Sequence, residues 1–179
     1  MLGNVLMVVG GLLAAVVVVV LILAAMKPAV FRVVRSASIN APREKVFEYI
    51  NDFHKWPAWS PWEKYDPDMN RTYGGSDCGV GATYAWDGNK KVGQGRMEIA
   101  ESTAPSKVSL NLEFLKPFKA QNTTDFILEP EGDGTKLTWD MQGPNQFMGK
   151  VMQVFMDMDG MVGKDFERGL SNLKEVAEK

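Results

Sequence analysis

Ile39-Asn-Ala-Pro-Arg-Glu-Lys-Val-Phe-Glu-Tyr-Ile-Asn-Asp-Phe53 and, shortly after it, Trp56-Pro-Ala-Trp-Ser-Pro-Trp62 are the stretches that decide the fold of this 179-residue chain. In the first stretch, Pro42 suits the first turn of a helix, and Asn40 can act as its cap. Apolar side chains then recur at helical spacing, at Val46, Phe47, Ile50 and Phe53. The sequence therefore predicts a short helix with one buried face, which the prolines of the second stretch end.

The residues on either side predict a strand and an antiparallel sheet. Val30 to Ile39 is rich in valine and alternates loosely, as expected of a first strand. From Gly79 onward, apolar and polar residues alternate over at least five strands, a pattern typical of a sheet with one face in water. Turns are predicted at 87–89, 104–106 and 131–134. The predicted inner face holds Tyr84, Trp86, Met97, Ile99, Val108, Leu110, Leu112, Phe114, Thr124, Phe126, Leu128, Leu137, Trp139 and Met141.

The last segment, from about Asn145 to Glu178, returns to helical periodicity and is expected to form one long helix, which Gly160 or Gly163 can bend. A helix of this length needs a partner for its apolar face, so we expect it to pack into the concave side of the sheet. Its apolar stripe consists of Met148, Met152, Phe155, Val162, Phe166, Leu170 and Leu173.

The first 26 residues differ from the rest, because all 20 basic and all 22 acidic side chains lie at or after Lys27. A helix from Val5 to Met26 is about 33 Å long, enough to cross a bilayer core of about 30 Å. We therefore expect a transmembrane anchor at 1–28 and one soluble domain at 29–179. A cleaved signal peptide is the alternative, but the segment lacks a basic N-terminal region and its apolar core is unusually long.

The flanks of the apolar segment predict its orientation in the membrane. No basic side chain precedes the segment, whereas Lys27, Arg32, Arg35, Arg43 and Lys45 follow it. Positively charged flanks usually stay on the cytoplasmic side of a membrane. We expect a single-pass membrane protein whose soluble domain lies in the cytoplasm.

The composition excludes several classes of protein and site. Cys78 is the single cysteine, so no internal disulfide can form, and the single histidine, His54, excludes a His-rich metal site. A net charge of −2 argues against the basic face of a nucleic-acid binder. Neither a metal nor another cofactor is expected.

The order of strand, short helices, antiparallel sheet and long terminal helix resembles the SRPBCC superfamily, also called START-like or Bet v 1-like, in its polyketide cyclase/dehydrase-like branch. The resemblance implies an α+β helix-grip fold, in which a curved sheet surrounds a C-terminal helix and two short helices follow the first strand. Known members hold an apolar ligand between the sheet and that helix, and a membrane helix is not part of their common pattern. The matching stretches are the two quoted above, Val80-Gly-Ala-Thr-Tyr84, Gly134-Thr-Lys-Leu-Thr-Trp139 and Phe166-Glu-Arg-Gly-Leu-Ser-Asn-Leu-Lys174.

The resemblance predicts a membrane-anchored domain that binds a lipid or another apolar small molecule. Six of the eleven methionines follow Leu137, and flexible methionine side chains can adapt to varied apolar shapes, although ordinary core packing explains them equally well. The acids Glu98, Glu113, Asp125 and Asp140 are expected on the wet face of the sheet. The predicted ligand-binding residues are Tyr84, Trp86, Met97, Leu112, Phe114, Phe126, Trp139, Met148, Met152 and Phe155.

Two other functions are compatible with the sequence. An enzyme of cyclase or dehydratase type would use His54 or Tyr84 as acid or base, although His54 also suits a capping or surface position. A protein-interaction or chaperone-like module would use Trp56, Trp59 and Trp62 as an exposed docking patch, but these residues suit the core equally well.

Overall fold

A seven-stranded antiparallel sheet forms the body of the protein in the computed structural model, which describes residues 2–179. The strands follow the order β1-β7-β6-β5-β4-β3-β2 across the sheet, so the first strand pairs with the last and β2 forms the far edge. Their bounds are β1 (Val30–Ile39), β2 (Asn70–Gly75), β3 (Ala82–Asp87), β4 (Gln94–Thr103), β5 (Lys107–Lys116), β6 (Ala120–Glu131) and β7 (Gly134–Pro144).

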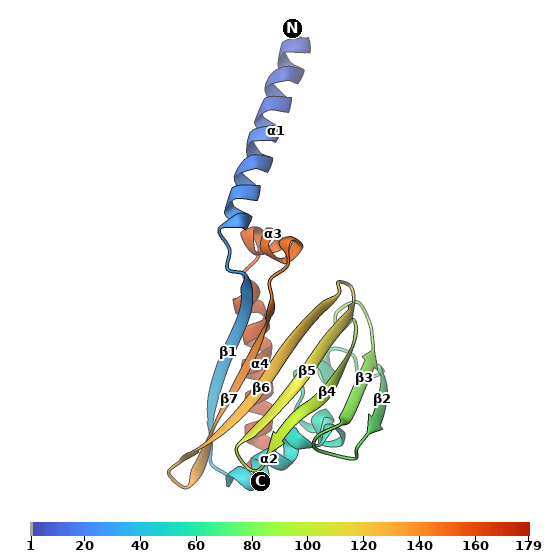
Figure 1. The fold of residues 1–179 in the computed structure, drawn as a ribbon, viewed down its shortest axis with the longest axis vertical. Helices are drawn as coiled ribbons and strands as arrows, with labels where there is room; N and C mark the ends of the chain where they lie inside the picture. Colours follow the sequence, from blue (N-terminus) through green and yellow to red (C-terminus); the bar gives the residue numbers. More distant parts are fainter. Residues whose placement is uncertain (1) are drawn as a thin grey trace.

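Within residues 2–179, four α-helices and two short 3-10 helices accompany the sheet (Figure 1). The N-terminal helix extends away from the sheet, while the C-terminal helix runs along it beside the first and seventh strands. The architecture is an α+β helix-grip fold. The helices are α1 (Leu2–Ala25), α2 (Arg43–Asn51), η1 (Phe53–Ala58), η2 (Pro61–Lys64), α3 (Phe147–Phe155) and α4 (Met158–Ala177).

The predicted strands and their inner face are confirmed. Burial alternates along β3, where Tyr84 and Trp86 are buried and their neighbours are less so. The edge strand β2 was not predicted, because Asn70-Arg-Thr-Tyr-Gly-Gly75 carries little apolar alternation. Its pairing with β3 places Tyr73 opposite Tyr84, so a tertiary contact stabilises this strand.

The prediction for the start of α2 was wrong in one detail. Pro42 occupies the N-cap position and contributes no side-chain hydrogen bond, so Asn40 is not the cap. The predicted apolar face is confirmed, since Val46, Phe47 and Ile50 are buried. Packing of this face against the sheet and α4 stabilises a helix of only nine residues.

The prediction of one long terminal helix was also wrong. The chain leaves helical geometry at Met156, and Asp157 begins α4 as an N-cap whose side chain accepts a hydrogen bond from the Gly160 amide at 2.9 Å. The break lets α3 turn away and pack against α1 instead of the sheet. Phe155 on α3 therefore does not continue the buried stripe of α4, which holds Phe166, Leu170 and Leu173.

Ion pairs attach α4 to the edge strand β1. The Arg35 guanidinium donates from Nε to Glu167 at 2.9 Å and from Nη2 to Asp159 at 3.0 Å, both on α4. Gly163 lies beneath this guanidinium, and a side chain at that position would occupy the space of the arginine. The absence of a side chain at Gly163 thus permits the close approach of helix and strand.

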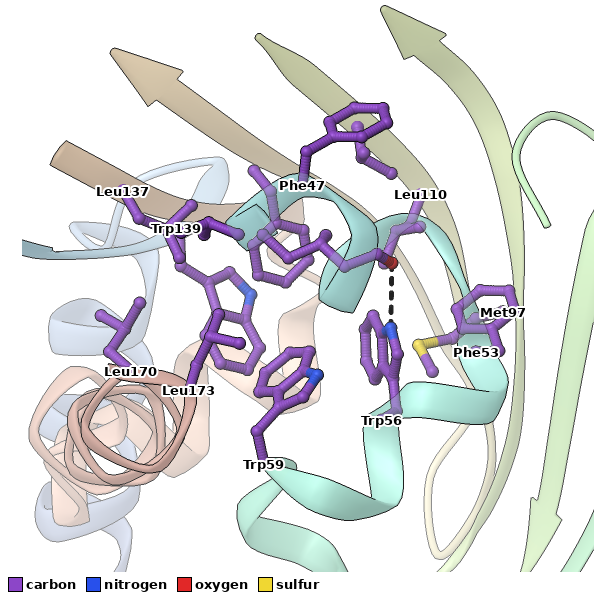
Figure 2. Close-up of a cluster of buried hydrophobic side chains, with 14 of the residues drawn as sticks. Phe47, Phe53, Trp56, Trp59, Met97, Leu110, Leu137, Trp139, Leu170 and Leu173 are labelled. Atoms are coloured by element: carbon purple, nitrogen blue, oxygen red, sulfur yellow. Dashed lines mark hydrogen bonds between the residues drawn. The ribbon is translucent and has the colours of Figure 1, made fainter. Parts of the chain in front are cut away.

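Aromatic side chains fill the core at the α2 end of the sheet (Figure 2). Trp56 donates its indole hydrogen to the Ile50 carbonyl at 3.0 Å, and Trp59 donates to the Tyr49 carbonyl at 3.1 Å. Trp56 and Trp59 are buried, and Trp62 packs against the core with part of its surface exposed. The hypothesis of an exposed docking patch of three tryptophans is therefore wrong.

Candidate ligand cavity

A cavity of about 640 Å³ lies between the concave face of the sheet and the helices α3 and α4. Its walls come from β3 to β7, and apolar side chains predominate among them. The aromatic core closes it toward α2, where Trp56 and Trp139 contribute to the wall. At the other end, the β5–β6 turn and α3 surround its mouth through residues such as Phe118 and Met148, which are largely exposed.

Most of the predicted ligand-binding residues line this cavity. The strand residues among them are buried or half-buried along the wall, whereas the two methionines of α3 lie near the mouth. Their role in binding remains a prediction. The lining residues are Tyr84, Trp86, Met97, Leu112, Phe114, Trp139, Met148 and Met152.

The remaining two predicted residues lie outside the cavity. Phe126 is fully buried and packs with its ring against Trp56, Trp59 and Trp139, so it belongs to the aromatic core behind the wall. Phe155 lies in the last turn of α3, where 70% of its surface is exposed. It borders a second, more open hollow of about 610 Å³ between the segment from Lys27 to Arg32 and the connection of α3 to α4.

A glycine on the neighbouring strand positions Trp86 in the cavity wall. The Trp86 ring lies over Gly95 of β4, where a Cβ atom would lie 2.5 Å from the ring carbons. The indole nitrogen donates a hydrogen bond to the Val92 carbonyl at 3.2 Å. Its polar atom is therefore satisfied by the protein, and the ring presents an apolar surface to the cavity.

Tyr84 is the predicted residue that brings a hydroxyl group to the cavity wall. Burial, with the nearby Glu63 carboxylate as the next cause, raises the pKa of the Tyr84 phenol far above its ordinary value. The hydroxyl consequently stays protonated across the physiological pH range. It can donate a hydrogen bond to an oxygen atom of a ligand, but it is a poor general base.

Sequence reasoning missed an ion pair next to Tyr84. Glu63 on η2 lines the cavity, and its carboxylate accepts hydrogen bonds from both Nε and Nη2 of Arg71 on β2. The Nε contact is 3.0 Å long. The arginine neutralises the carboxylate, so a charged residue is tolerated in a largely apolar wall. Because Arg71 lies on the strand that the sequence does not predict, periodicity could not have paired the two residues.

His54 does not belong to the cavity. Its ring stacks on Tyr73 with centroids 4.4 Å apart, and its Nδ1 atom lies 3.0 Å from the Asp52 carboxylate. Its side chain is 55% exposed and is not part of the cavity wall. The alternative interpretation of His54 as a surface residue is the one that agrees with its position.

Two buried polar atoms behind the wall have no hydrogen-bond partner within residues 2–179. They are Oγ1 of Thr124 and Nε1 of Trp139, each almost fully shielded from solvent. Because a water-sized molecule in the cavity does not reach either atom, neither offers a hydrogen bond to a ligand in this conformation. Among the described residues, no group of three His, Cys, Asp or Glu side chains is placed to hold a metal ion.

The remaining candidate feature is α1. From Leu6 to Ala25 it is long and apolar enough to cross a membrane, and it is the one such helix in the part of the chain that the structure describes. A signal sequence near the N-terminus has the same properties. The packing of Ala24, which is fully buried near α3, joins the end of α1 to the rest of the protein.

Comparison with known proteins identifies the family of residues 30–178. The protein family described as polyketide cyclase / dehydrase and lipid transport matches residues 30–178. A comparison with curated proteins gave no match.

Several solved structures share the fold at low sequence identity. The crystal structure of protein CV1439 from Chromobacterium violaceum aligns with a TM-score of 0.59 at 15% identity, over 86% of this chain and 99% of that one. The solution structure of the Aha1 dimer from Colwellia psychrerythraea aligns with a TM-score of 0.58 at 14% identity, over 83% of this chain and 96% of that one. The crystal structure of ginseng major latex-like protein 151 from Panax ginseng aligns with a TM-score of 0.60 at 9% identity, over 85% of this chain and 100% of that one. Identities this low establish the common fold alone.

Proposed function

We propose, from the premise that this chain belongs to the polyketide cyclase / dehydrase and lipid transport family, that its domain binds a lipid or another apolar small molecule in the cavity between sheet and helices. The observation that carries the proposal is the cavity itself. A volume of about 640 Å³ and predominantly apolar walls are typical of a small-molecule site.

The polar groups of the wall indicate which chemical groups a ligand should carry. The ion pair of Glu63 with Arg71 neutralises both charges, and the protonated Tyr84 hydroxyl provides a hydrogen-bond donor close by. A ligand with a long apolar part and at least one oxygen atom would satisfy this arrangement. Lys91, Lys116 and Lys119 border the mouth, where they favour an anionic group that stays near solvent.

We further propose that α1 anchors the domain to a membrane, with the domain on the cytoplasmic side. The burial of Ala24 near α3 supports retention of this helix, because a cleaved signal peptide would leave that packing unfilled. The basic residues that follow α1, such as Lys27 and Arg32, support the orientation. Anchoring would raise the local concentration of a membrane ligand at the cavity.

Native mass spectrometry of the full chain, purified from membranes in a mild detergent, tests both parts of the proposal. We expect the intact mass to include residues 1–26, and we expect a bound apolar molecule distinct from the detergent. Met152→Trp places a larger ring at the cavity mouth and should remove that molecule. Met161→Trp is the matched control, because Met161 is exposed on α4 and lines neither hollow.

Three results would contradict the proposal. Equal retention of the ligand in both variants, with both folded by near-UV circular dichroism, would place the binding site outside the cavity. A ligand-free wild type, even after incubation with a membrane lipid extract, would contradict a binding function. A mature mass that begins after residue 26 would contradict the anchor.

A further inference from the structure

The helix α3 has an apolar surface that the protein itself does not cover. Six of its nine residues are Phe, Met or Val, and none of the nine, all of which the structure describes, is buried. Phe147 is 60% exposed and Phe155 is 70% exposed. A concentration of large apolar side chains on one exposed element marks an interaction site in a folded protein.

The position of α3 indicates what covers it. The helix lies beside the C-terminal end of α1, to which it is packed near Ala24 (Figure 1). The 24 residues of α1 give a length of about 36 Å, slightly more than a bilayer core of about 30 Å. When α1 spans a bilayer, its last turns and the attached α3 therefore lie at the interface between lipid and water.

A second exposed apolar side chain lies at the same end of the protein. Phe118 in the β5–β6 turn is 62% exposed, and this turn points toward the end of the molecule that carries α3 and α1 (Figure 1). Phe118 and Met148 both line the cavity mouth, so the turn and the helix lie on either side of the opening.

Unpaired basic residues surround these apolar side chains. Lys116 and Lys119 flank Phe118, and Lys150 lies on α3, and none of the three forms an ion pair within residues 2–179. At the opposite end of the sheet, the β6–β7 turn Glu131-Gly-Asp-Gly134 carries two acidic residues. Basic residues around exposed aromatic rings complement the anionic headgroups of a bilayer.

We propose that α3 and the β5–β6 turn form a docking face that rests on the bilayer spanned by α1, so that the cavity opens directly toward lipid. The docking face consists of Phe118, Phe147, Phe155, Lys116, Lys119 and Lys150. The aromatic side chains enter the headgroup region and the lysines contact anionic lipids. This inference rests on the proposed anchoring by α1 but not on the occupancy of the cavity.

Site-directed spin labelling of the full chain in liposomes tests the docking face. Cys78→Ser removes the single native cysteine, and Phe118→Cys or Phe147→Cys then places a label on the docking face. Asp133→Cys labels the opposite end, and Leu13→Cys labels the middle of α1. Access to dissolved oxygen, which concentrates in lipid, is compared with access to a water-soluble nickel chelate.

We expect labels at 118, 147 and 13 to favour oxygen and the label at 133 to favour nickel. The preference at 118 should be stronger in phosphatidylcholine with phosphatidylglycerol than in phosphatidylcholine alone. Lys116→Gln and Lys119→Gln should each lower the ratio of docked to undocked chains by about fivefold in the anionic liposomes, the effect of one basic residue near such a surface. An equal preference for oxygen at 118 in both lipid mixtures would contradict the proposed contact of the lysines with anionic lipids.

The remaining outcomes separate this inference from the proposed function. Nickel access at 118 and 147, with the label at 13 in lipid, would overturn docking while leaving the anchor in place. Low access of both reagents to the labels at 118 and 147 would indicate that another protein surface, such as a second copy of the chain, covers them. This result would also overturn docking. Labels in lipid on a chain that carries no ligand in mass spectrometry would support docking and contradict only the binding function.

Discussion

The indole ring of Trp139 on β7 stacks face to face on the ring of Phe166 on α4, with ring centroids 4.0 Å apart and an interplanar angle of 8°. Both residues line the cavity, and both are almost fully buried. The contact therefore joins the sheet to the C-terminal helix at the point where the cavity meets the aromatic core.

Removal of one ring from this stack should destabilise the domain. Phe166→Ala loses buried apolar surface and leaves a void, so we expect a loss of roughly 3–5 kcal/mol in the free energy of unfolding. Thermal unfolding of the full chain in detergent, followed by near-UV circular dichroism, measures the change. Phe147→Ala is the control, because its exposed ring should contribute little. Similar melting temperatures for the two variants would contradict the importance of the stack.

Gly169 permits the close contact between α4 and Trp139. A Cβ atom at this position would lie 2.9 Å from the Trp139 ring and 3.1 Å from Pro61. Although alanine favours helix formation by about 1 kcal/mol, Gly169→Ala should be destabilising, because overpacking costs roughly 1–3 kcal/mol. Ser171→Ala, on an exposed position of the same helix, should change stability by less than about 0.5 kcal/mol. A Gly169→Ala variant that melts above the wild type would show that the helix can move away without loss.

Two buried threonines provide a matched test of hydrogen bonding. The Thr124 hydroxyl has no partner within residues 2–179, whereas the Thr135 hydroxyl donates to the Ala41 carbonyl at 2.8 Å. We expect Thr124→Val to stabilise the protein by about 1 kcal/mol and Thr135→Val to destabilise it by about 1–3 kcal/mol. Thermal melting of both variants measures the difference. Equal destabilisation would mean that Thr124 has a partner in solution, such as a bound water molecule.

The raised pKa of Tyr84 predicts a titration behaviour at alkaline pH. Because burial raises the folded pKa above the ordinary value of about 10, the unfolded chain loses this proton first, and stability falls as the pH rises above about 10. In the folded protein, Tyr84→Phe should not change the tyrosinate absorbance that develops between about pH 9 and pH 11. In guanidinium chloride, the same variant should lose one quarter of the amplitude, since the chain has four tyrosines. A loss of amplitude in the folded state would show that solvent reaches the Tyr84 hydroxyl.

Cys78 can report the proposed orientation in the membrane. It is the single cysteine of the chain, and it is exposed in the loop between β2 and β3. In intact spheroplasts that express the full chain, a membrane-impermeant maleimide should not label Cys78, and labelling should appear after lysis. Labelling before lysis would place the domain on the outer side. The Cys78→Ser variant controls for reaction with other groups.

The outline of the fold could be read from the sequence because it depends on local periodicity. The alternation from Tyr84 to Met141 marks the inner face of the sheet, since successive side chains of a strand point to opposite sides. Val46, Phe47 and Ile50 mark the buried face of α2 for the corresponding helical reason. The same periodicity located most of the cavity wall, because the wall is the inner face of the sheet. The length and composition of residues 5–26 similarly indicated a helix able to cross a membrane.

Other features depended on contacts between different helices and strands, which the periodicity of a single element does not reveal. The ion pair of Glu63 with Arg71 joins a 3-10 helix to an edge strand that only pairing with β3 stabilises. Phe126 alternates in phase with the wall, yet Trp56 and Trp59 cover it, so the register of the strand could not reveal its exclusion from the cavity.

The last two helices show most clearly which features follow from the local sequence and which depend on the tertiary structure. The sequence by itself determined that most of residues 147–177 are helical and apolar on one face, because propensity and spacing are local properties. Asp157 provides a local cap for α4. Only the tertiary structure decided that the chain breaks before this helix, which Arg35 holds against β1. That break releases α3 to pack against α1, because each apolar face is buried where a partner surface exists.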